Sequence, residues 1–257
     1  MTKRRTYKWH EMPGPEVAEL AQETDVAVLP MGCVEMHGPH LPTGTDAIRA
    51  EGAAELIAEQ EPVIILPTLY LNMNDQMKAY PGTIAMSPAL VVNILRELCS
   101  EAARNGFRKI VLLVAHGGVN AGFDFLLHTL KHERVEDYSV FALNIGQFRP
   151  LAADAMESPV REGHGGEGET SNVAYFRPEL VHLDRLEPLP EGEGPYFEKS
   201  IPEVQYKVDW ILQVPKGYVG RPHLATPEKG ARIVEVTVRE CVRIIRQIKG
   251  FDLTREA

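Results

Sequence analysis

The sequence predicts an α/β protein with three layers, α/β/α, in which a mostly parallel sheet lies between two layers of helices. Short, almost continuous apolar runs alternate along the chain with longer amphipathic stretches. Strands covered on both faces have the first pattern, and helices that cross between parallel strands have the second. With 257 residues, of which 44% are hydrophobic, the chain can bury a substantial core, and we expect residues 1–257 to form one domain.

The first half of the chain contains two predicted strands and two predicted helices. Residues 26–31 and 62–66 are short apolar runs of the kind that form buried strands. Between them, residues 46–60 place alanine and isoleucine at helical spacing. A Ser-Pro pair at residues 87–88 is typical of a helix start, with the serine as cap, and an Asn-Gly pair at 105–106 is typical of a helix end.

The second half of the chain continues this alternation. We expect strands over residues 109–115 and 139–144, and helices over 121–134, from Thr170 or Ser171 to Tyr175, and from Thr226 to Lys249. The stretch from Leu186 to Pro222 is rich in glycine and proline. We interpret it as an excursion over the surface rather than a linker between two domains.

Acidic and histidine side chains follow two of the predicted strands. Glu35 and His37 come soon after the first strand and lie two residues apart, so in an extended chain they project from the same side. Asp46 lies beyond a turn containing glycine and proline, and can fold back toward them. His116 directly follows the third strand, and the carboxyl ends of parallel strands meet at one edge of a sheet. These four residues therefore predict a divalent-metal site at that edge.

A glycine-rich segment supplies the remaining candidates. His164 suits general acid–base catalysis near neutral pH, and Glu167 and Glu169 are both candidate metal ligands. With one glutamate of this pair, the first cluster gives two histidines and three carboxylates, which can hold two divalent ions with one carboxylate bridging. Such a pair activates water and polarises a carbonyl group, which suits hydrolysis. A phosphate-binding loop is less consistent with this segment, because it lacks lysine and carries two acids.

Cys33 lies beside the first cluster and has two interpretations. It could be a nucleophile, but no partner base is assigned to it. We interpret it instead as a small buried residue. The three cysteines are dispersed along the chain, which argues against a disulfide framework.

Composition argues against several classes of partner. The net charge of −9 argues against a nucleic-acid-binding surface. No apolar run approaches the length needed to span a bilayer, and the polar N-terminal residues lack the apolar core of a signal peptide. We expect a cytoplasmic protein that acts on a small molecule, with neither a nucleic-acid nor a membrane partner.

Several segments, in order along the chain, resemble the creatininase (creatinine amidohydrolase) family. Residues 29–46 resemble its first signature, Tyr80-Pro-Gly-Thr83 a Phe-Pro-Gly-Thr element, 116–118 a His-Gly-Gly-Asn turn, 164–171 a His-Ala-Gly-Glu-x-Glu-Thr-Ser element, and 217–230 the closing segment. The resemblance implies an α/β/α fold with a mostly parallel sheet. It also implies a binuclear centre of zinc, manganese or iron, with ligands and a substrate site at matching positions, and a homohexamer.

Roles for individual residues follow from the resemblance. Glu35 and His116 would bind one metal ion, His37 the other, and Asp46 would bridge them. His164 would assist proton transfer to the leaving group, with Glu167 beside it in catalysis. Matching positions predict substrate contacts for a set of loop residues, namely Tyr80, Gly82, Thr83, Gly117 and Gly118.

The chain departs from creatininase itself at two places. Gly118 stands where creatininase has a glutamate ligand, so we assign the missing carboxylate to Glu169, with Glu167 as the competitor. Creatininase closes over creatinine with tryptophans, whereas Trp9 and Trp210 lie outside the matching segments. We therefore expect a substrate other than creatinine.

The expected reaction is hydrolysis of a small cyclic amide or a related amide-type C–N bond. One alternative is hydrolysis of a C–C bond in a cyclic polyol ketone such as a keto-inositol, since relatives in the family carry out that reaction. Deformylase and peptidase activities also occur among relatives. A further alternative is a non-catalytic, metal-binding member of the family.

Overall fold

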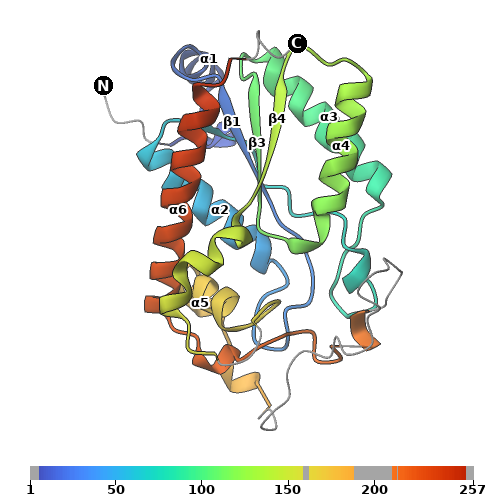
Figure 1. The fold of residues 1–257 in the computed structure, drawn as a ribbon, viewed down its shortest axis with the longest axis vertical. Helices are drawn as coiled ribbons and strands as arrows, with labels where there is room; N and C mark the ends of the chain where they lie inside the picture. The colour runs from blue at the N-terminus through green and yellow to red at the C-terminus, as the bar shows by residue number, and fades with distance from the viewer. Residues whose placement is uncertain (1–5, 159–161, 188–209, 213, 253–257) are drawn as a thin grey trace.

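The computed structural model describes residues 6–158, 162–187, 210–212 and 214–252 (Figure 1). Its four strands are all parallel and lie in the order β2-β1-β3-β4. They are β1 (Val26–Met31), β2 (Ile64–Ile65), β3 (Lys109–Val114) and β4 (Ser139–Asn144). The α-helices are α1 (Gly14–Glu23), α2 (Thr45–Gln60), α3 (Pro88–Arg104), α4 (Asn120–His132), α5 (Glu167–Phe176) and α6 (Pro227–Lys249).

The sheet separates two hydrophobic clusters, as the predicted three-layer fold requires. Alternate residues of β1 face opposite ways, so Leu29 packs with α1, α3 and α4 while Val28 packs with α2 and α6. The central strand β3 divides in the same way, with Leu112 on the first side and Leu113 on the second. Figure 1 shows α3 and α4 on one side of the strands and α2 and α6 on the other. The predicted α/β/α fold is confirmed.

Two predicted elements differ from the structure. The second strand is reduced from 62–66 to Ile64–Ile65. Helix α5 begins at Glu167, three residues before the expected start, because the carboxylate of Glu162 accepts the backbone N–H of Glu167 at 2.6 Å. Thr170 and Ser171 therefore lie inside the helix instead of capping it. Glu162 lies five residues before the helix start, so it cannot be recognised from the sequence as a cap in the way that a Ser or Thr directly before a helix can.

The predicted caps of two other helices differ in outcome. Thr226 caps α6 as expected, accepting the backbone N–H of Lys229. Ser87 occupies the predicted cap position of α3, but its side chain makes no capping hydrogen bond. Most of the glycine- and proline-rich stretch 186–222 cannot be compared with its prediction, since residues 188–209 and 213 lie outside the described residues.

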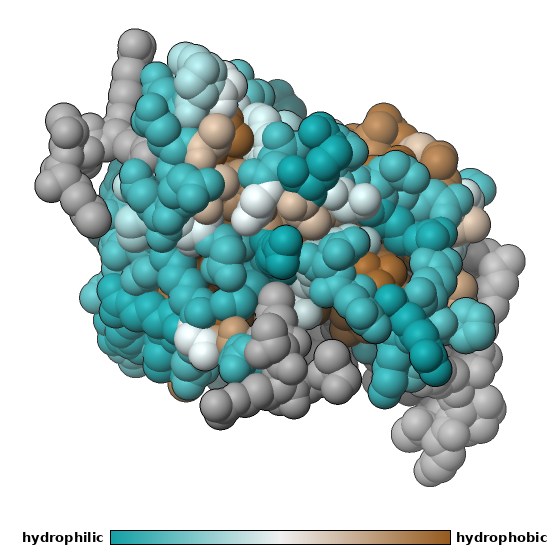
Figure 2. Space-filling model, turned by 90° about the horizontal axis from the view of Figure 1, so that it is seen from above, coloured by the Kyte–Doolittle hydropathy of each residue, from teal (hydrophilic) through white to brown (hydrophobic). Residues whose placement is uncertain are grey.

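The visible surface is mostly polar. Seen from above in Figure 2, hydrophilic residues cover most of the molecule and apolar residues form small patches. Within the described ranges, no helix has the length and apolar character needed to cross a membrane.

Gly32 allows the end of β1 to pass very close to the first turn of α2. A β-carbon at this position would lie only 2.1 Å from the backbone nitrogen of Ala47 and 2.6 Å from the backbone carbon of Asp46. A Gly32→Ala variant should therefore lose about 3 kcal/mol of unfolding free energy. It should also bind divalent metal more weakly, because the helix turn that carries Asp46 must move.

Chemical denaturation and metal titration would measure both effects. Gly14→Ala is the matched control, since no heavy atom lies within 4 Å of a β-carbon at Gly14. If both variants unfolded at the same denaturant concentration as the unmodified chain, the close approach at Gly32 would not contribute to the free energy of unfolding.

Candidate metal centre

The segment that follows β1 presents three buried side chains on one side. Val34 forms an antiparallel bridge with Ile84, which keeps this segment extended. Cys33, Glu35 and His37 are all fully buried, whereas Val34 between them is only partly buried. The two-residue period therefore brings the carboxylate and the imidazole to the same side, as the spacing predicts.

Asp46 lies between two imidazole rings. It occupies the first turn of α2, and its Oδ2 is 3.1 Å from Nδ1 of His116, which follows β3. Its Oδ1 is 3.5 Å from Nε2 of His37. Glu35 Oε1 is 3.2 Å from His116 Nδ1, and Glu169 Oε2, on α5, is 3.6 Å from His37 Nε2. The structure thus brings all five predicted ligands together.

The donor set fits divalent cations. Three groups of side-chain atoms each lie within 4.8 Å of one another. Two of them share Asp46: one includes Glu35 and His116, the other His37 and Glu169. The third consists of Glu35, His37 and His164. Within the described part of the chain, three buried atoms of the cluster make no hydrogen bond: both carboxylate oxygens of Glu35 and Nε2 of His37. Buried polar atoms without partners are costly unless a ligand binds them, and carboxylates with imidazoles suit zinc or manganese.

The electrostatics of the cluster also favour cations. Burial alone would lower the pKa of His37, but Asp46, Glu35 and Glu169 outweigh it and raise that pKa to about 9. Burial opposes ionisation of Asp46 too, yet His37 and His116 hold its pKa well below the usual range. Asp46 therefore stays charged and attracts positive charge, which metal ions would supply in place of protons.

Glu169, rather than Glu167, reaches this cluster. Besides its approach to His37, Glu169 accepts a hydrogen bond from Arg49 at 2.6 Å and one from the backbone N–H of Gly165 at 2.8 Å. Arg49 also donates to Asp46 at 3.3 Å. Arg49 therefore orients two of the predicted ligands from a position one helical turn after Asp46.

Glu167 faces a different part of the molecule. Its carboxylate is fully buried, accepts a hydrogen bond from Lys229 at 2.6 Å, and accepts the backbone N–H groups of Glu157 and Ser158. Residues two apart on a helix point in widely different directions, so Glu167 and Glu169 cannot both face the cluster. The structure gives Glu167 a place in the contact between α5 and α6, which does not support the catalytic role expected for it.

His164 lies against the cluster with one ring nitrogen anchored. Its Nε2–H donates to the carbonyl of Met36 at 2.6 Å, and its Nδ1 is 3.4 Å from Glu35 Oε1. The ring stacks on His37 with a centroid distance of 3.9 Å. Burial and the neighbouring His37 lower the pKa of His164. A neutral ring with Nδ1 directed at the cluster can accept a proton there and return it.

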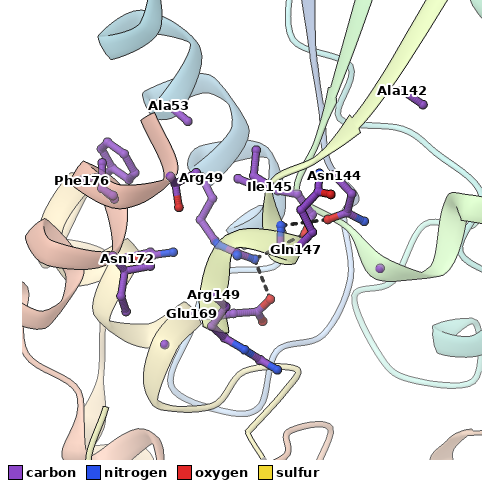
Figure 3. Close-up of a pocket in the computed structure, with 17 residues that line it drawn as sticks. Arg49, Ala53, Ala142, Asn144, Ile145, Gln147, Arg149, Glu169, Asn172 and Phe176 are labelled. Carbon is purple, nitrogen blue, oxygen red and sulfur yellow. Dashed lines mark hydrogen bonds and ion pairs between the residues drawn. The ribbon is translucent and has the colours of Figure 1, made fainter. Parts of the chain in front are cut away.

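A pocket of about 510 Å³ lies beside the cluster (Figure 3). Arg49 and Glu169 form part of its wall, so the pocket reaches the predicted metal ligands. Its other polar side chains come from five residues that the sequence analysis did not identify: Asn144, Gln147, Arg149, Asn172 and Thr237. Of these polar residues, only Arg49 could have been singled out from the sequence, because it is a charged residue one turn after Asp46 on an alanine-rich helix.

His40 lies behind the cluster as a buried neutral imidazole. Its Nε2–H donates to the carbonyl of Gly165 at 3.0 Å, and burial lowers its pKa to about 4. In the unfolded chain a histidine titrates near pH 6.5. As the pH falls below 6.5, the unfolded state therefore takes up a proton that the folded state refuses, and stability is lost down to about pH 4. We expect His40 to remove about 2 kcal/mol between pH 7 and pH 5.

Denaturation of the metal-free protein at pH 7 and pH 5 would measure this loss, with His40→Gln for comparison. The variant should lose less stability than the unmodified chain over the same interval. An identical pH dependence for the two proteins would show that His40 is not the group responsible.

The comparisons with known proteins agree with this geometry. The family model described as creatinine amidohydrolase matches residues 10–245, a range that contains the whole cluster. The chain belongs to the creatininase family. Its three-layer fold and its histidine- and carboxylate-rich site are thus those of a creatininase-family protein.

Three curated relatives carry different names. The creatinine amidohydrolase of Pseudomonas putida is 27% identical, over 90% of this chain and 92% of its own length. The 3-dehydro-scyllo-inosose hydrolase of Thermotoga maritima is 24% identical, over 91% and 80%. The mycofactocin precursor peptide peptidase of Mycobacterium ulcerans is 27% identical, over 88% and 86%. These relatives are all hydrolases, but their substrates differ.

Solved creatininase structures share the fold of this family member. A manganese form is 26% identical and has a TM-score of 0.81, covering 95% of this chain and 99% of its own. A Zn–Zn form of a creatininase variant has the same identity and TM-score, with coverage of 96% and 99%. Those two proteins are therefore manganese and zinc forms of the same fold.

The loop at 80–83 makes structural contacts in this creatininase-family chain, and its predicted contact with substrate stays a prediction. Tyr80 is buried, and its hydroxyl donates to the carbonyl of Val214 at 2.6 Å. Thr83 accepts the backbone N–H of Met36 and so supports the ligand segment, while Gly82 has a φ of 75° that favours glycine. Within the described residues, the pocket wall does not include these three. Their predicted contact with substrate lacks support from this pocket.

The two glycines after His116 occupy separate places. Gly117 lines the pocket, and its predicted contact with substrate stays a prediction. Gly118 lies against His116, and a β-carbon there would be 2.6 Å from the Nε2 of that ring. This chain therefore has no carboxylate at that position, and Glu169 supplies one from α5 instead.

Trp210 is the functional-site residue that sequence reasoning placed elsewhere. Its ring meets the ring of His164 edge to face, with centroids 5.1 Å apart. Trp9, by contrast, packs on Phe107 in the region of the first core cluster. Because one tryptophan does lie at the site, the positions of the tryptophans no longer argue against creatinine as a substrate.

Proposed function

We propose that this creatininase-family chain is a metal-dependent hydrolase that cleaves a small carbonyl compound, such as a cyclic amide or a related amide-type C–N bond. The observation that carries the proposal is a cluster of three carboxylates and two imidazoles with Asp46 at its centre. This cluster borders a pocket of about 510 Å³. That volume suits a small molecule. The hydrolase names of the curated relatives support the reaction class.

The residues of the site have separate tasks in this reaction. Two divalent ions, when bound, supply the Lewis acidity that activates water and polarises a carbonyl group. Asp46, with one oxygen directed at each imidazole, holds the two halves of the cluster together. Arg49 fixes the orientation of Asp46 and Glu169. His164, whose Nε2–H is held by the carbonyl of Met36, can take a proton from the attacking water on Nδ1 and then pass it to the leaving nitrogen.

A second candidate is hydrolysis of a C–C bond in a cyclic polyol ketone such as a keto-inositol. The amide side chains of Asn144, Gln147 and Asn172 on the pocket wall favour it. Amides both donate and accept hydrogen bonds, which the hydroxyl groups of a polyol require. The inosose hydrolase among the curated relatives gives the same reaction a precedent. A cytoplasmic location and a homo-oligomeric, hexameric state remain part of the proposal.

A substrate screen of the purified, metal-loaded chain tests the proposal. The protein is stripped with a chelator and reloaded with Zn²⁺, Mn²⁺ or Fe²⁺. It is then incubated with creatinine, other cyclic amides, short peptides and keto-inositols. Turnover that depends on metal is the expected result, and the substrate converted decides between C–N and C–C cleavage. Tight metal binding without turnover of any of these compounds would favour a non-catalytic member of the family.

A further inference from the structure

We propose that the thiolate of Cys33 is a ligand of one of the two metal ions. This inference rests on the metal centre of the proposed function. It gives that ion a mixed site of one sulfur, two carboxylates and one imidazole, from Cys33, Glu35, Asp46 and His116. The second ion, held by His37, Asp46 and Glu169, keeps only oxygen and nitrogen ligands.

The backbone directs Cys33 to the cluster. Cys33, Glu35 and His37 alternate along the extended segment, with Val34 and Met36 between them only partly buried. A two-residue period places the thiol on the same side as the two predicted ligands. The thiol also lies within 4.8 Å of the ligand nitrogen of His116.

The distances fit one ion among these four side chains. Their ligand atoms all lie within 4.8 Å of one another, and His116 Nδ1 is 3.1 Å from Asp46 and 3.2 Å from Glu35. A tetrahedral zinc with bonds of about 2.0 Å to nitrogen and oxygen separates those ligands by about 3.3 Å. With a bond of about 2.3 Å to sulfur, the sulfur lies about 3.5 Å from each of them. Because the present separations are at most 4.8 Å, the sulfur would have to approach each of these ligands by about 1.3 Å at most to complete the tetrahedron.

The partners around this position indicate a missing ligand. Both oxygens of Glu35, which is fully buried, lack a hydrogen bond among the described residues. The Cys33 thiol donates a long hydrogen bond to the carbonyl of Met73, at 3.6 Å, and a thiol is a weak donor. Its setting is also polar, since Cys33 belongs to neither of the large hydrophobic clusters, whereas Cys99 and Cys241 each lie inside one.

A sulfur ligand changes which metal this site prefers. Thiolates select softer ions, so zinc gains over manganese at the Cys33 site. The site formed by His37, Asp46 and Glu169 has no such bias. The two positions of the centre should therefore differ in metal preference, with zinc retained longest at the site that contains Cys33.

Cobalt spectroscopy tests this assignment without any measurement of activity. The metal-free full-length chain is titrated with Co²⁺, and the near-ultraviolet charge-transfer band of a cobalt–thiolate bond is recorded. The unmodified protein should show the band, and Cys33→Ala and Cys33→Ser should lose it. Cys99→Ala and Cys241→Ala are matched controls and should keep it, since both residues are buried away from the cluster. Circular dichroism would verify that each variant folds.

Metal competition gives a second, independent readout. The preference for Zn²⁺ over Mn²⁺ should fall at least about 10-fold in Cys33→Ser, which keeps a side chain of similar size. Cobalt bound by the unmodified chain without a thiolate band would overturn the role of Cys33 alone. Failure of the unmodified chain to bind cobalt or zinc at all would overturn the metal centre itself, and the two failures are thus distinguishable.

Discussion

Replacing Asp46 with alanine should remove both metal ions and reduce turnover roughly 10³-fold or more, which corresponds to about 4 kcal/mol of transition-state stabilisation. Asp46 is 1% exposed and belongs to two of the three groups of candidate ligands. Its two oxygens face His116 and His37 separately. No other carboxylate of the cluster is shared in this way between those two groups, so its loss should affect both ions together.

Elemental analysis of the purified variant would measure this effect, together with the rate on whichever substrate the screen identifies. Asp124→Ala is the matched control, because Asp124 is an exposed aspartate of α4 and lies outside the candidate clusters. The control should retain about two ions per chain. An Asp46→Ala protein that still held two ions, or that turned over substrate at the normal rate, would contradict a bridging role.

Replacing Glu169 with glutamine should remove one of the two ions and lower turnover roughly 10²-fold or more, whereas Glu167→Gln should retain both ions. Glu169 approaches His37 and is held by Arg49, while Glu167 is bound by Lys229. The Glu167 variant should instead lose about 2 kcal/mol of stability, because it weakens a buried charged hydrogen bond between α5 and α6.

The two glutamate variants control for each other, since both replace a carboxylate by an amide on one helix turn. Metal content separates the roles, and denaturation measures the structural cost. If Glu167→Gln lost a metal ion while Glu169→Gln kept both, the assignment of the two carboxylates would be reversed.

Much of the fold and the first part of the site follow from simple periodicities. Apolar runs identified β1 and β3, and the spacing of Glu35 and His37 predicted their shared side because an extended chain has a fixed period of two. The carboxyl ends of parallel strands then predicted that His116 would meet them. These inferences depend only on backbone geometry that the sequence pattern reports directly.

The remaining features depend on contacts between distant parts of the chain. Nothing local distinguishes Glu169 from Glu167, since both lie in the first turn of α5, and the rotation of that helix depends on its packing against α2 and α6. Trp210 reaches His164 across 46 residues of sequence, as the difference of their numbers shows. The start of α5 likewise depends on Glu162, whose carboxylate acts from outside the helix.

The ligands come from four separate elements: the segment after β1, the first turn of α2, the loop after β3, and α5. Ions bound between them would act as crosslinks that join sheet edge and helices without any covalent bond. Each ion binds the folded chain only, so its binding free energy adds to the free energy of unfolding. Availability of metal would then determine not only the rate of the reaction but also the lifetime of the folded protein.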